Sequence, residues 1–208
     1  MGFRNLFMSN SFELNVIGDL MLDEHRFYTI SKVSPEAPVP VLEYKSQKIT
    51  LGGCGNLAAC LSVLGFKVNL FGVCCIDSMD DMKKLFSNYN LEPKNLFATS
   101  EIKTTRKLRL IADNQQICRI DEDSSLTEKN LNLFSEYFNN NASKNVLLSL
   151  SDYAKGVSDI LLENLGRPAP KYIDPKYNDW SRYKNCEFMK ANEIELAEAF
   201  KFSQCSDP

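Results

Sequence analysis

The sequence has a single histidine, His25, and no C-x-x-C pair among its cysteines. A structural zinc site needs clustered cysteine and histidine ligands, so these two absences argue against one. The cysteines are odd in number, scattered and mostly in apolar surroundings, which predicts buried free thiols in a reducing compartment. They are Cys54, Cys60, Cys74, Cys75, Cys118, Cys186 and Cys205.

Long apolar runs and an excess of positive charge are also absent. The longest apolar stretches, such as VNLFGVCCI, are too short to span a bilayer, and the N-terminal segment lacks the long apolar core of a signal peptide. The net charge is −3 and the pI is near 5.3, so the electrostatic footprint of a nucleic-acid binder is missing. We therefore expect a cytoplasmic protein that binds neither membranes nor nucleic acid.

What is present is typical of a globular α/β protein. The chain has 208 residues, 44% of them hydrophobic and 25% charged, which is enough for one large α/β domain. Predicted strands alternate with predicted helices, and this favours a mostly parallel sheet flanked by helices. The strands are expected at 12–23, 67–74, 145–150, 171–174 and 186–191, and the helices at 56–65, 77–89, 127–140, 157–166 and 192–200. Asp77 or Ser78 is expected to cap the second helix.

Two β-rich excursions, at roughly 26–50 and 102–121, interrupt this alternation. Three prolines within 35–40 remove backbone donors from the first excursion, which places it at a sheet edge or away from the core. The second alternates in character about a polar pair, Asp113 and Asn114, and this is typical of a β-hairpin. We expect the two segments to form a small β lid over the main sheet.

The stretch LGGCGNLAAC, residues 51–60, places three glycines at a turn that leads into a helix. Gly53–Ala58 satisfies G-x-G-x-x-G/A, and Asp77 lies at about the distance of a ribose-binding acid, so a dinucleotide-binding domain is one interpretation. Against it, the segment before the glycines is polar, whereas that fingerprint follows a buried central strand. A P-loop does not fit, because no Lys-Ser or Lys-Thr pair closes the turn.

A polyol ligand is the third interpretation. A carboxylate at the end of a strand accepts hydrogen bonds from adjacent hydroxyls, and ligands of open parallel sheets bind at that edge. Asp19 is expected there, with Gly52, Gly53 and Asn56 forming the opposite wall of the same pocket. This chemistry is suited to a sugar.

Several motifs occur in an order and spacing that resemble one family. They are VIGDLMLD, VSPEAPVPVLE, LGGCGNLAACLSVLG, KLRLIADNQQICRIDED, LSDYAKG, YIDPK and ANEIE. From about residue 13 to residue 200, the chain resembles the heptose-7-phosphate kinase domain of bacterial ADP-heptose synthases, within the ribokinase-like (PfkB) sugar kinases. The resemblance implies an α/β ribokinase-like core with a β lid and ATP and Mg²⁺ as cofactors. It also implies phosphate transfer to the anomeric hydroxyl of a sugar phosphate, on the way to ADP-heptose for lipopolysaccharide core or surface glycan.

The resemblance also assigns substrate ligands. Asp19 and Asp152 would face the sugar, and Lys155 would face a phosphate. Alternation places Lys107 and Arg109 on one face of the lid hairpin, where they can meet the substrate's own phosphate. The whole expected substrate-binding set is Asp19, Asp23 in the same loop as Asp19, Gly52, Gly53, Asn56, Lys107, Arg109, Arg119, Asp121, Asp152 and Lys155.

A second group of residues would contact ATP. Asp174 and Lys176 in the DPK segment would face the side of phosphate transfer. Asn192 and Glu195 match the N-x-x-E pattern that, in the resembled family, organises magnesium and the ATP phosphates. We expect Glu195 to act on Mg²⁺ through water, since that ion keeps most of its hydration shell. Asn192 would also serve as the N-cap of a helix, which is compatible with this role.

Sugar kinases of this type carry a Gly-Ala-Gly-Asp segment well beyond N-x-x-E, which stabilises the transferring phosphoryl group and accepts the hydroxyl proton. The sequence ends at Pro208 without one. We therefore expect residues 1–208 to form a single, C-terminally truncated kinase domain, with no catalytic base and little activity alone. The expected partners are the sugar phosphate and either a second copy bound through the β lid or a complementing C-terminal segment.

Two other functions remain open at this point. One is a dinucleotide-binding domain that uses Gly53–Ala58, and tight NADH binding that is lost in Gly55→Val would support it. The other is a non-catalytic sugar-binding or dimerisation module, which would dimerise without kinase activity.

Overall fold

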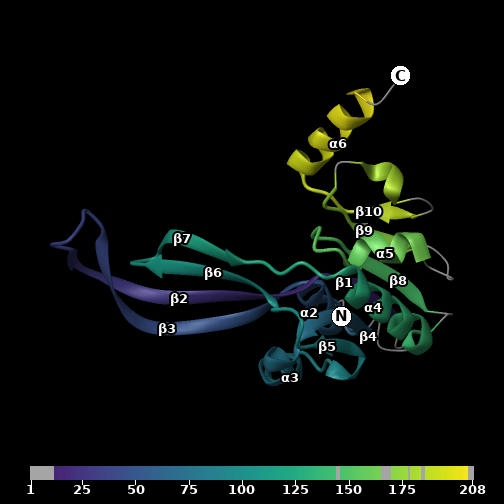
Figure 1. Cartoon of the computed structure of the whole chain (residues 1–208), viewed down its shortest axis with the longest axis horizontal. Helices are drawn as coiled ribbons and strands as arrows, with labels where there is room; N and C mark the ends of the chain where they lie inside the picture. The colour runs from purple at the N-terminus through teal and green to yellow at the C-terminus, as the bar shows by residue number, and fades with distance from the viewer. Residues whose placement is uncertain (1–11, 144–145, 165–169, 178, 184–185, 206–208) are drawn as a thin grey trace, which may run out of the picture.

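The computed structural model describes residues 12–143, 146–164, 170–177, 179–183 and 186–205. In this part of the chain the larger sheet has six parallel strands in the order β10-β9-β8-β1-β4-β5 (Figure 1). The strands are β1 (Glu13–Gly18), β4 (Lys67–Cys75), β5 (Leu96–Thr99), β8 (Leu147–Ser151), β9 (Tyr172–Asp174) and β10 (Phe188–Met189). The expected parallel sheet is confirmed, and β5 is a strand that the sequence did not predict.

Alternate residues of the central strands face opposite sides of this sheet, and both sides are buried. Val16 and Leu70 pack with residues of α2 and α3, whereas Ile17 and Phe71 pack with residues of α4 and α5. Strands that are apolar on both faces are typical of parallel sheets with helices on each side. The helices are α2 (Cys54–Val63), α3 (Met79–Ser87), α4 (Glu128–Asn141), α5 (Val157–Asn164) and α6 (Glu193–Cys205).

A second sheet of four strands extends away from the first, and we call it the lid (Figure 1). Its strands, in the order β3-β2-β6-β7, are β2 (Leu20–Val33), β3 (Pro40–Gly53), β6 (Thr105–Ala112) and β7 (Gln115–Glu122). The lid is larger than the expected segments 26–50 and 102–121. The strand expected at 12–23 is in fact divided, because β1 ends at Gly18 and β2 begins at Leu20 as part of the lid.

The two hairpins of the lid follow the turn chemistry of the sequence. Asp113 and Asn114 join β6 to β7 with φ values of 48° and 67°, the left-handed pair that tight hairpin turns require. Pro35 and Pro38 lie in the connection between β2 and β3, and Pro40 begins β3, which is an edge strand. The predicted hairpin and the predicted edge position of the prolines are both confirmed.

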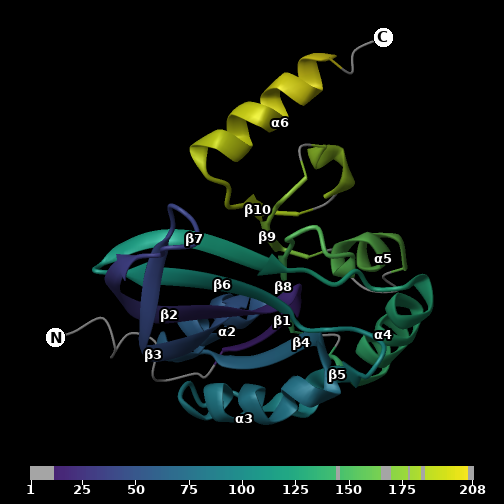
Figure 2. The same ribbon diagram turned by 60° about the vertical axis from the view of Figure 1, so that its left-hand side comes forward.

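Two helices differ from expectation at their ends. A 3-10 turn (Ile76–Ser78) precedes α3, and Ser78, one of the two expected residues, is the N-cap of α3, but its side chain makes no capping hydrogen bond. α6 continues past residue 200 and projects away from the sheets in both views (Figures 1 and 2). None of the helices in the described ranges is long and apolar enough to cross a membrane.

The cysteines of the described residues are free, as expected, but only some of them are buried. Cys54, Cys74 and Cys75 are buried, whereas Cys60 on α2 and Cys118 on β7 are exposed. Local apolar sequence therefore misjudged the last two: all of β7 is exposed, and Cys60 lies on an exposed part of α2.

Candidate functional site

Acidic residues from three parallel strands meet at the carboxyl edge of the larger sheet. Asp19 follows β1, Asp152 follows β8, and Asp174 ends β9. The N–H of Asp19 donates to the carbonyl of Ser151 (3.2 Å), and the N–H of Asp152 donates to the carbonyl of Asp174 (3.0 Å). Ligands of open parallel sheets bind at this edge, and the lid also begins here.

Gly52 and Gly53 bring the end of lid strand β3 against this edge. Gly53 precedes α2 with a φ of 55°, and a Cβ there would lie 2.1 Å from the backbone oxygen of Asp19. A Cβ on Gly52 would lie 2.4 Å from Oδ2 of Asp23. Gly53 needs glycine, because backbone lies where a side chain would be and its φ is positive, whereas a side chain at Gly52 would displace the Asp23 carboxylate.

The dinucleotide-binding interpretation of Gly53–Ala58 does not fit this geometry. That fingerprint follows a central strand of a parallel sheet, whereas β3 is the edge strand of the lid and pairs antiparallel with β2. In addition, the first amide of α2, that of Cys54, donates to the carbonyl of Asp19 (3.0 Å).

The Asp19 carboxylate is held by backbone amides of the segment between β8 and α5. Oδ2 accepts hydrogen bonds from the N–H groups of Tyr153 (2.7 Å) and Lys155 (3.1 Å), and Oδ1 accepts one from Val157 (3.4 Å). The residue is 2% exposed. Burial raises the pKa of the Asp19 carboxyl from 3.8 to about 6; the three amides oppose this shift and the charge of Asp152 adds to it.

We expect this burial to make stability depend on pH between about 4 and about 6. In that window the folded chain binds a proton at Asp19 more tightly than the unfolded chain does. The free energy of unfolding therefore falls by about 2 to 3 kcal/mol as the pH rises, and it levels off above pH of about 6. Urea titrations of the natural chain and of Asp19→Asn across this range isolate the effect as their difference. A difference that does not change with pH would contradict it.

Asp152 is also a buried carboxylate with protein partners. It is 2% exposed, its Oδ1 accepts the N–H of Ala154 (2.8 Å), and its Oδ2 accepts the hydroxyl of Tyr183 (2.7 Å). Burial, together with this hydrogen bond, raises the pKa of the Tyr183 hydroxyl. Asp152 and Asp19 thus anchor the loop 152–156 from two sides.

Removing the Tyr183 hydroxyl is expected to lower the free energy of unfolding by about 2 kcal/mol, because one buried oxygen of Asp152 then loses its donor. Tyr137→Phe is the matched control, since the Tyr137 hydroxyl donates to the carbonyl of Lys94 (2.9 Å) at an exposed position. We expect that control to change stability by about 0.5 kcal/mol or less. Chemical denaturation of Tyr183→Phe and Tyr137→Phe measures both effects, and equal losses would count against the role given to Tyr183.

The lid carries charged side chains on the face from which Lys107 reaches the loop 152–156, and we call this its inner face. The alternate residues Leu20 and Leu22 pack in the core instead. Asp23 lies opposite Lys107 in the pairing of β2 with β6, and Lys107 lies opposite Asp121 in the pairing of β6 with β7. Oδ1 of Asp23 lies 2.5 Å from Nη1 of Arg109, whereas Arg119 pairs with Asp121 on its own strand (2.7 and 2.8 Å). Asp23 therefore lies within a lid strand and not in the loop with Asp19.

Two contacts join the inner face of the lid to the loop 152–156. Nζ of Lys107 lies 5.3 Å from the centre of the Tyr153 ring, and Nζ of Lys155 lies 2.7 Å from Oδ2 of Asp123, which follows β7. Tyr153 was missed by the sequence analysis, which assigned roles only to Asp152 and Lys155 in this motif. The available signal was its place inside the SDYAKG motif, between Asp152 and Lys155.

A cavity of about 700 Å³ opens between α2 and the part of the sheet formed by β8, β9 and β10. Asn56, Tyr153, Asp174 and Lys190 line it, together with the stacked rings of Tyr172 and Phe188. Nζ of Lys190 lies 3.4 Å from Oδ1 of Asp174. Burial raises the pKa of Asp174, and Lys190 opposes the shift. The cavity brings together three predicted residues, Gly53, Asn56 and Asp174, and adds Tyr153 and Lys190, which were not predicted.

Asp19 does not line this cavity. It lines a smaller one, of about 20 Å³, together with Lys155 and with Thr105 of the lid. Asp19 and Asn56 thus line two different cavities here, and the Asp19 carboxylate turns toward the loop amides. A direct contact between Asp19 and sugar hydroxyls remains a prediction.

Asn192 and Glu195 form a reciprocal cap at the start of α6. The N–H of Asn192 donates to Oε2 of Glu195 (2.9 Å), and the N–H of Glu195 donates to Oδ1 of Asn192 (2.9 Å). The structural role expected of Asn192 is thus present. Glu195 also contributes to the raised pKa of Asp174. Lys176 is exposed beside this region.

The donor set on this side fits Mg²⁺ held mainly through water. Asp174 and Glu195 supply hard carboxylate oxygens, which this ion prefers. Within the described ranges, no group of three or more histidine, cysteine, aspartate or glutamate residues is placed to hold a metal ion. A site with one or two protein carboxylates, completed by water and phosphate oxygens, is the arrangement that these residues allow.

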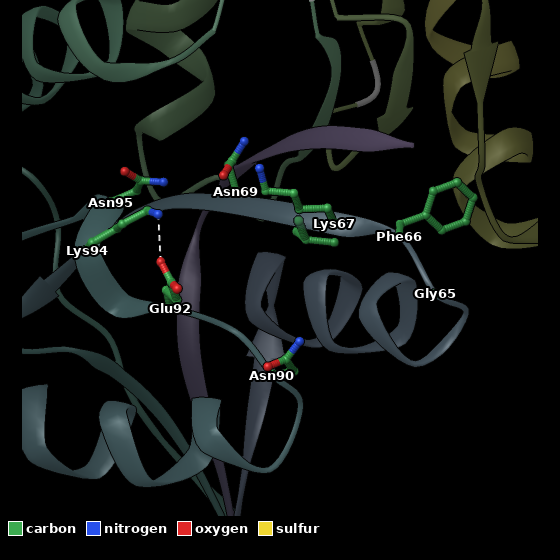
Figure 3. Close-up of a pocket in the computed structure, with 9 residues that line it drawn as sticks. Gly65, Phe66, Lys67, Asn69, Asn90, Glu92, Lys94 and Asn95 are labelled. Atoms are coloured by element: carbon green, nitrogen blue, oxygen red, sulfur yellow. Dashed lines mark ion pairs between the residues drawn. The ribbon is translucent and has the colours of Figure 1, made fainter. Parts of the chain in front are cut away.

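A second cavity, of about 430 Å³, lies at the opposite end of the sheet (Figure 3). It is lined by the beginning of β4, including Lys67 and Asn69, and by a segment that includes Glu92 and Lys94. Lys94 pairs with Glu92 (2.6 Å), and Lys67 pairs with Glu13 (3.3 Å). This cavity is at the amino end of the strands, away from the predicted site residues.

Comparisons with known proteins identify the relatives of this chain. No protein-family model matches it. The chain is 35% identical over 193 residues to the bifunctional protein HldE of Desulfatibacillum aliphaticivorans, a match that covers 88% of this chain and 40% of that protein. It is 32% identical over 188 residues to D-beta-D-heptose 7-phosphate kinase of Bordetella bronchiseptica, with 88% and 60% covered. The chain thus spans less than two thirds of the length of these relatives.

Solved structures with the same fold are kinases. One is the nucleoside kinase of Methanocaldococcus jannaschii, an archaeal member of the ribokinase family, with a TM-score of 0.62 and 14% identity over 91% of this chain and 63% of that one. Another is the ribokinase of Arabidopsis thaliana, solved with ribose and ATP, with a TM-score of 0.58 and 16% identity over 91% and 62%.

The fold of this chain is therefore ribokinase-like. By sequence, the chain's homologues are the bifunctional protein HldE and D-beta-D-heptose 7-phosphate kinase. The predicted fold class and the resemblance on which it rested are both confirmed.

Proposed function

We propose that the chain is part of a carbohydrate kinase that transfers phosphate from ATP to a sugar phosphate, namely heptose 7-phosphate at its anomeric hydroxyl. The observation that carries this proposal is the similarity, over 88% of the chain, to a protein named D-beta-D-heptose 7-phosphate kinase. The proposal is also supported by the acidic and basic side chains that lie close together at the carboxyl edge of the larger sheet. We place the reaction in the cytoplasm, on the way to ADP-heptose for lipopolysaccharide core or surface glycan.

The sugar side of the proposed site lies under the inner face of the lid. Asp23 can accept hydrogen bonds from adjacent hydroxyls, and the absence of a side chain at Gly52 lets its carboxylate lie close to that backbone. Arg109, which already orients Asp23, presents a guanidinium that suits the phosphate the substrate carries. Lys107 adds a second cation, and Asn56 supplies amide groups from α2. The other predicted ligands, Asp19, Gly53, Arg119, Asp121, Asp152 and Lys155, complete this proposal.

The nucleotide side lies around Asp174. We propose that Asp174, Lys176, Asn192 and Glu195 contact the ATP phosphates, with Glu195 acting on Mg²⁺ through water. When bound there, the ion neutralises charge on the phosphates. The position of Asp174 in the cavity that Asn56 also lines supports a site in which nucleotide and sugar meet. We assign the base for the hydroxyl proton to none of the described residues.

Calorimetry with heptose 7-phosphate tests the proposal on the chain as it is. We expect binding of the sugar phosphate, affinity for the unphosphorylated heptose that is weaker by about tenfold or more, and no binding of NADH. A folded chain that binds both sugars equally, or neither, would contradict the proposal. Tight binding of NADH would instead favour the dinucleotide-binding alternative.

We also propose a protein partner, either a second copy of this chain at the lid or a complementing segment at α6. Apolar side chains are exposed at both places: Val33, Val39, Tyr44 and Ile120 on the lid, and Ile194, Leu196 and Phe200 on α6. The unpaired edges of β3 and β7 would also accept another strand.

If the lid joins two copies, Val33→Asp is expected to keep the chain monomeric at concentrations where the natural chain dimerises, because it places a charge in the apolar contact. Sedimentation velocity measures the change. Val63→Asp, at an exposed position on α2, is the control and should leave dimerisation unchanged. A natural chain that stays monomeric, or a dimer that persists in Val33→Asp, would contradict dimerisation through the lid and would favour a partner segment at α6.

A further inference from the structure

Asp19 joins three parts of the molecule. It is the single residue between β1 of the larger sheet and β2 of the lid. Its carbonyl accepts the N–H of Cys54 at the start of α2 (3.0 Å). Its carboxylate accepts the amides of Tyr153, Lys155 and Val157 at 2.7, 3.1 and 3.4 Å. With three donors and 2% exposure, the carboxylate already has the partners that a buried charge needs.

The segment that Asp19 holds is the one that contacts the lid. Tyr153 and Lys155 donate their N–H groups to the same oxygen, Oδ2 of Asp19. Their side chains then reach the lid, where the Tyr153 ring lies 5.3 Å from Nζ of Lys107 and Nζ of Lys155 lies 2.7 Å from Oδ2 of Asp123. A shift of this segment relative to Asp19 therefore displaces both lid contacts together.

The packing around Asp19 leaves little space in which such a shift could be absorbed. A Cβ on Gly18 would lie 2.0 Å from the carbonyl oxygen of Ser151, and a Cβ on Gly53 would lie 2.1 Å from the carbonyl oxygen of Asp19. Backbone thus lies against backbone at both glycines, Gly18 and Gly53, around Asp19. Close-packed elements transmit a displacement to their neighbours instead of deforming.

We infer that Asp19 is a positioning residue that sets where the lid rests on the core. Its carboxylate fixes the segment from Tyr153 to Val157, and this segment holds Lys107 of the lid and Asp123, the residue that follows lid strand β7. The inference concerns the chain without any ligand, so it goes beyond the proposed function and does not depend on it.

Hydrogen exchange of the ligand-free chain, measured by mass spectrometry, tests whether the lid contacts depend on the hold that Asp19 has on the segment from Tyr153 to Val157. In Asp19→Asn the amide oxygen can replace only one carboxylate oxygen, the side-chain NH2 group then faces the N–H of Val157 or of the other two donors, and the negative charge that strengthens all three hydrogen bonds is removed, so the hold on the segment weakens. We expect exchange to rise about tenfold both in the segment from Tyr153 to Val157 and in the lid hairpin 105–122. In Lys107→Met we expect a rise in the hairpin alone, because the amides held by Asp19 are untouched.

Met82→Ala is the matched control, since Met82 is fully buried in α3 and its loss destabilises the chain from the other side of the sheet. If the rise in exchange is distributed along the chain in Asp19→Asn as it is in Met82→Ala, Asp19 has only a general structural role and the inference is wrong. The inference is also wrong if the segment loosens while the hairpin does not. If Asp19→Asn does not fold, the double variant Lys107→Met/Lys155→Met decides, and an unchanged hairpin overturns the inference.

Discussion

Gly18→Ala is expected to lower the free energy of unfolding by about 4 kcal/mol or more, although it adds one methyl group. The Cβ would lie 2.0 Å from the carbonyl oxygen and 2.9 Å from the carbonyl carbon of Ser151, so β1 and β8 must separate where the site is built. The φ of 152° adds backbone strain for any residue with a side chain. Chemical denaturation, with the fold checked by circular dichroism, measures the loss.

Gly65→Ala is the matched control for this prediction. Gly65 also has a positive φ, 96°, but nothing lies within 4 Å of the Cβ that alanine would add. We therefore expect a loss of about 1 kcal/mol from backbone strain alone. Similar losses in the two variants would show that the contact with Ser151 is not what requires glycine at position 18.

Arg109→Met is expected to weaken binding of heptose 7-phosphate by about thirtyfold, because two contributions are lost together. The guanidinium no longer meets the substrate's phosphate, and Asp23 loses the partner that lies 2.5 Å away and orients its carboxylate. Calorimetry of the natural chain and the variant measures the ratio of dissociation constants.

Lys45→Met is the control for Arg109→Met, since it removes the same charge from an exposed position on lid strand β3. We expect it to change affinity by less than about twofold at moderate salt, because a distant exposed charge is screened. A control that weakens binding as much as Arg109→Met would mean that the net charge of the lid, and no specific contact, attracts the substrate. An unchanged affinity in Arg109→Met would remove this residue from the proposed site.

The general arrangement of the fold could be predicted because it follows from local patterns. Apolar strands alternating with helices indicated the parallel sheet, and the Asp113–Asn114 pair indicated the lid hairpin. The four-residue strand β5 was missed, because a segment of that length carries too little periodicity to be recognised. The division of the first strand at Asp19 was also missed, because apolar residues precede the break and continue after it as far as Leu22.

The site was harder to predict than the fold, because its contacts join residues far apart in the sequence. The pairing of Asp19 with the amide of Tyr153 spans 134 positions, and no local pattern shows that an acid will be satisfied by backbone. Strand spacing placed Asp19 at the correct edge of the sheet but could not give the direction of its side chain. Likewise, the presence of Asp23 within the lid depends on the β2–β6 pairing, which only the tertiary structure provides.

A crystal structure of the chain with heptose 7-phosphate tests the central claim most directly, namely that the carboxyl edge of the sheet and the inner face of the lid bind a sugar phosphate. We predict sugar hydroxyls within hydrogen-bonding distance of Asp23 and Asn56, and the phosphate beside Arg109. A sugar phosphate bound instead in the cavity around Lys67 and Lys94, or at any place away from this edge, would contradict the account.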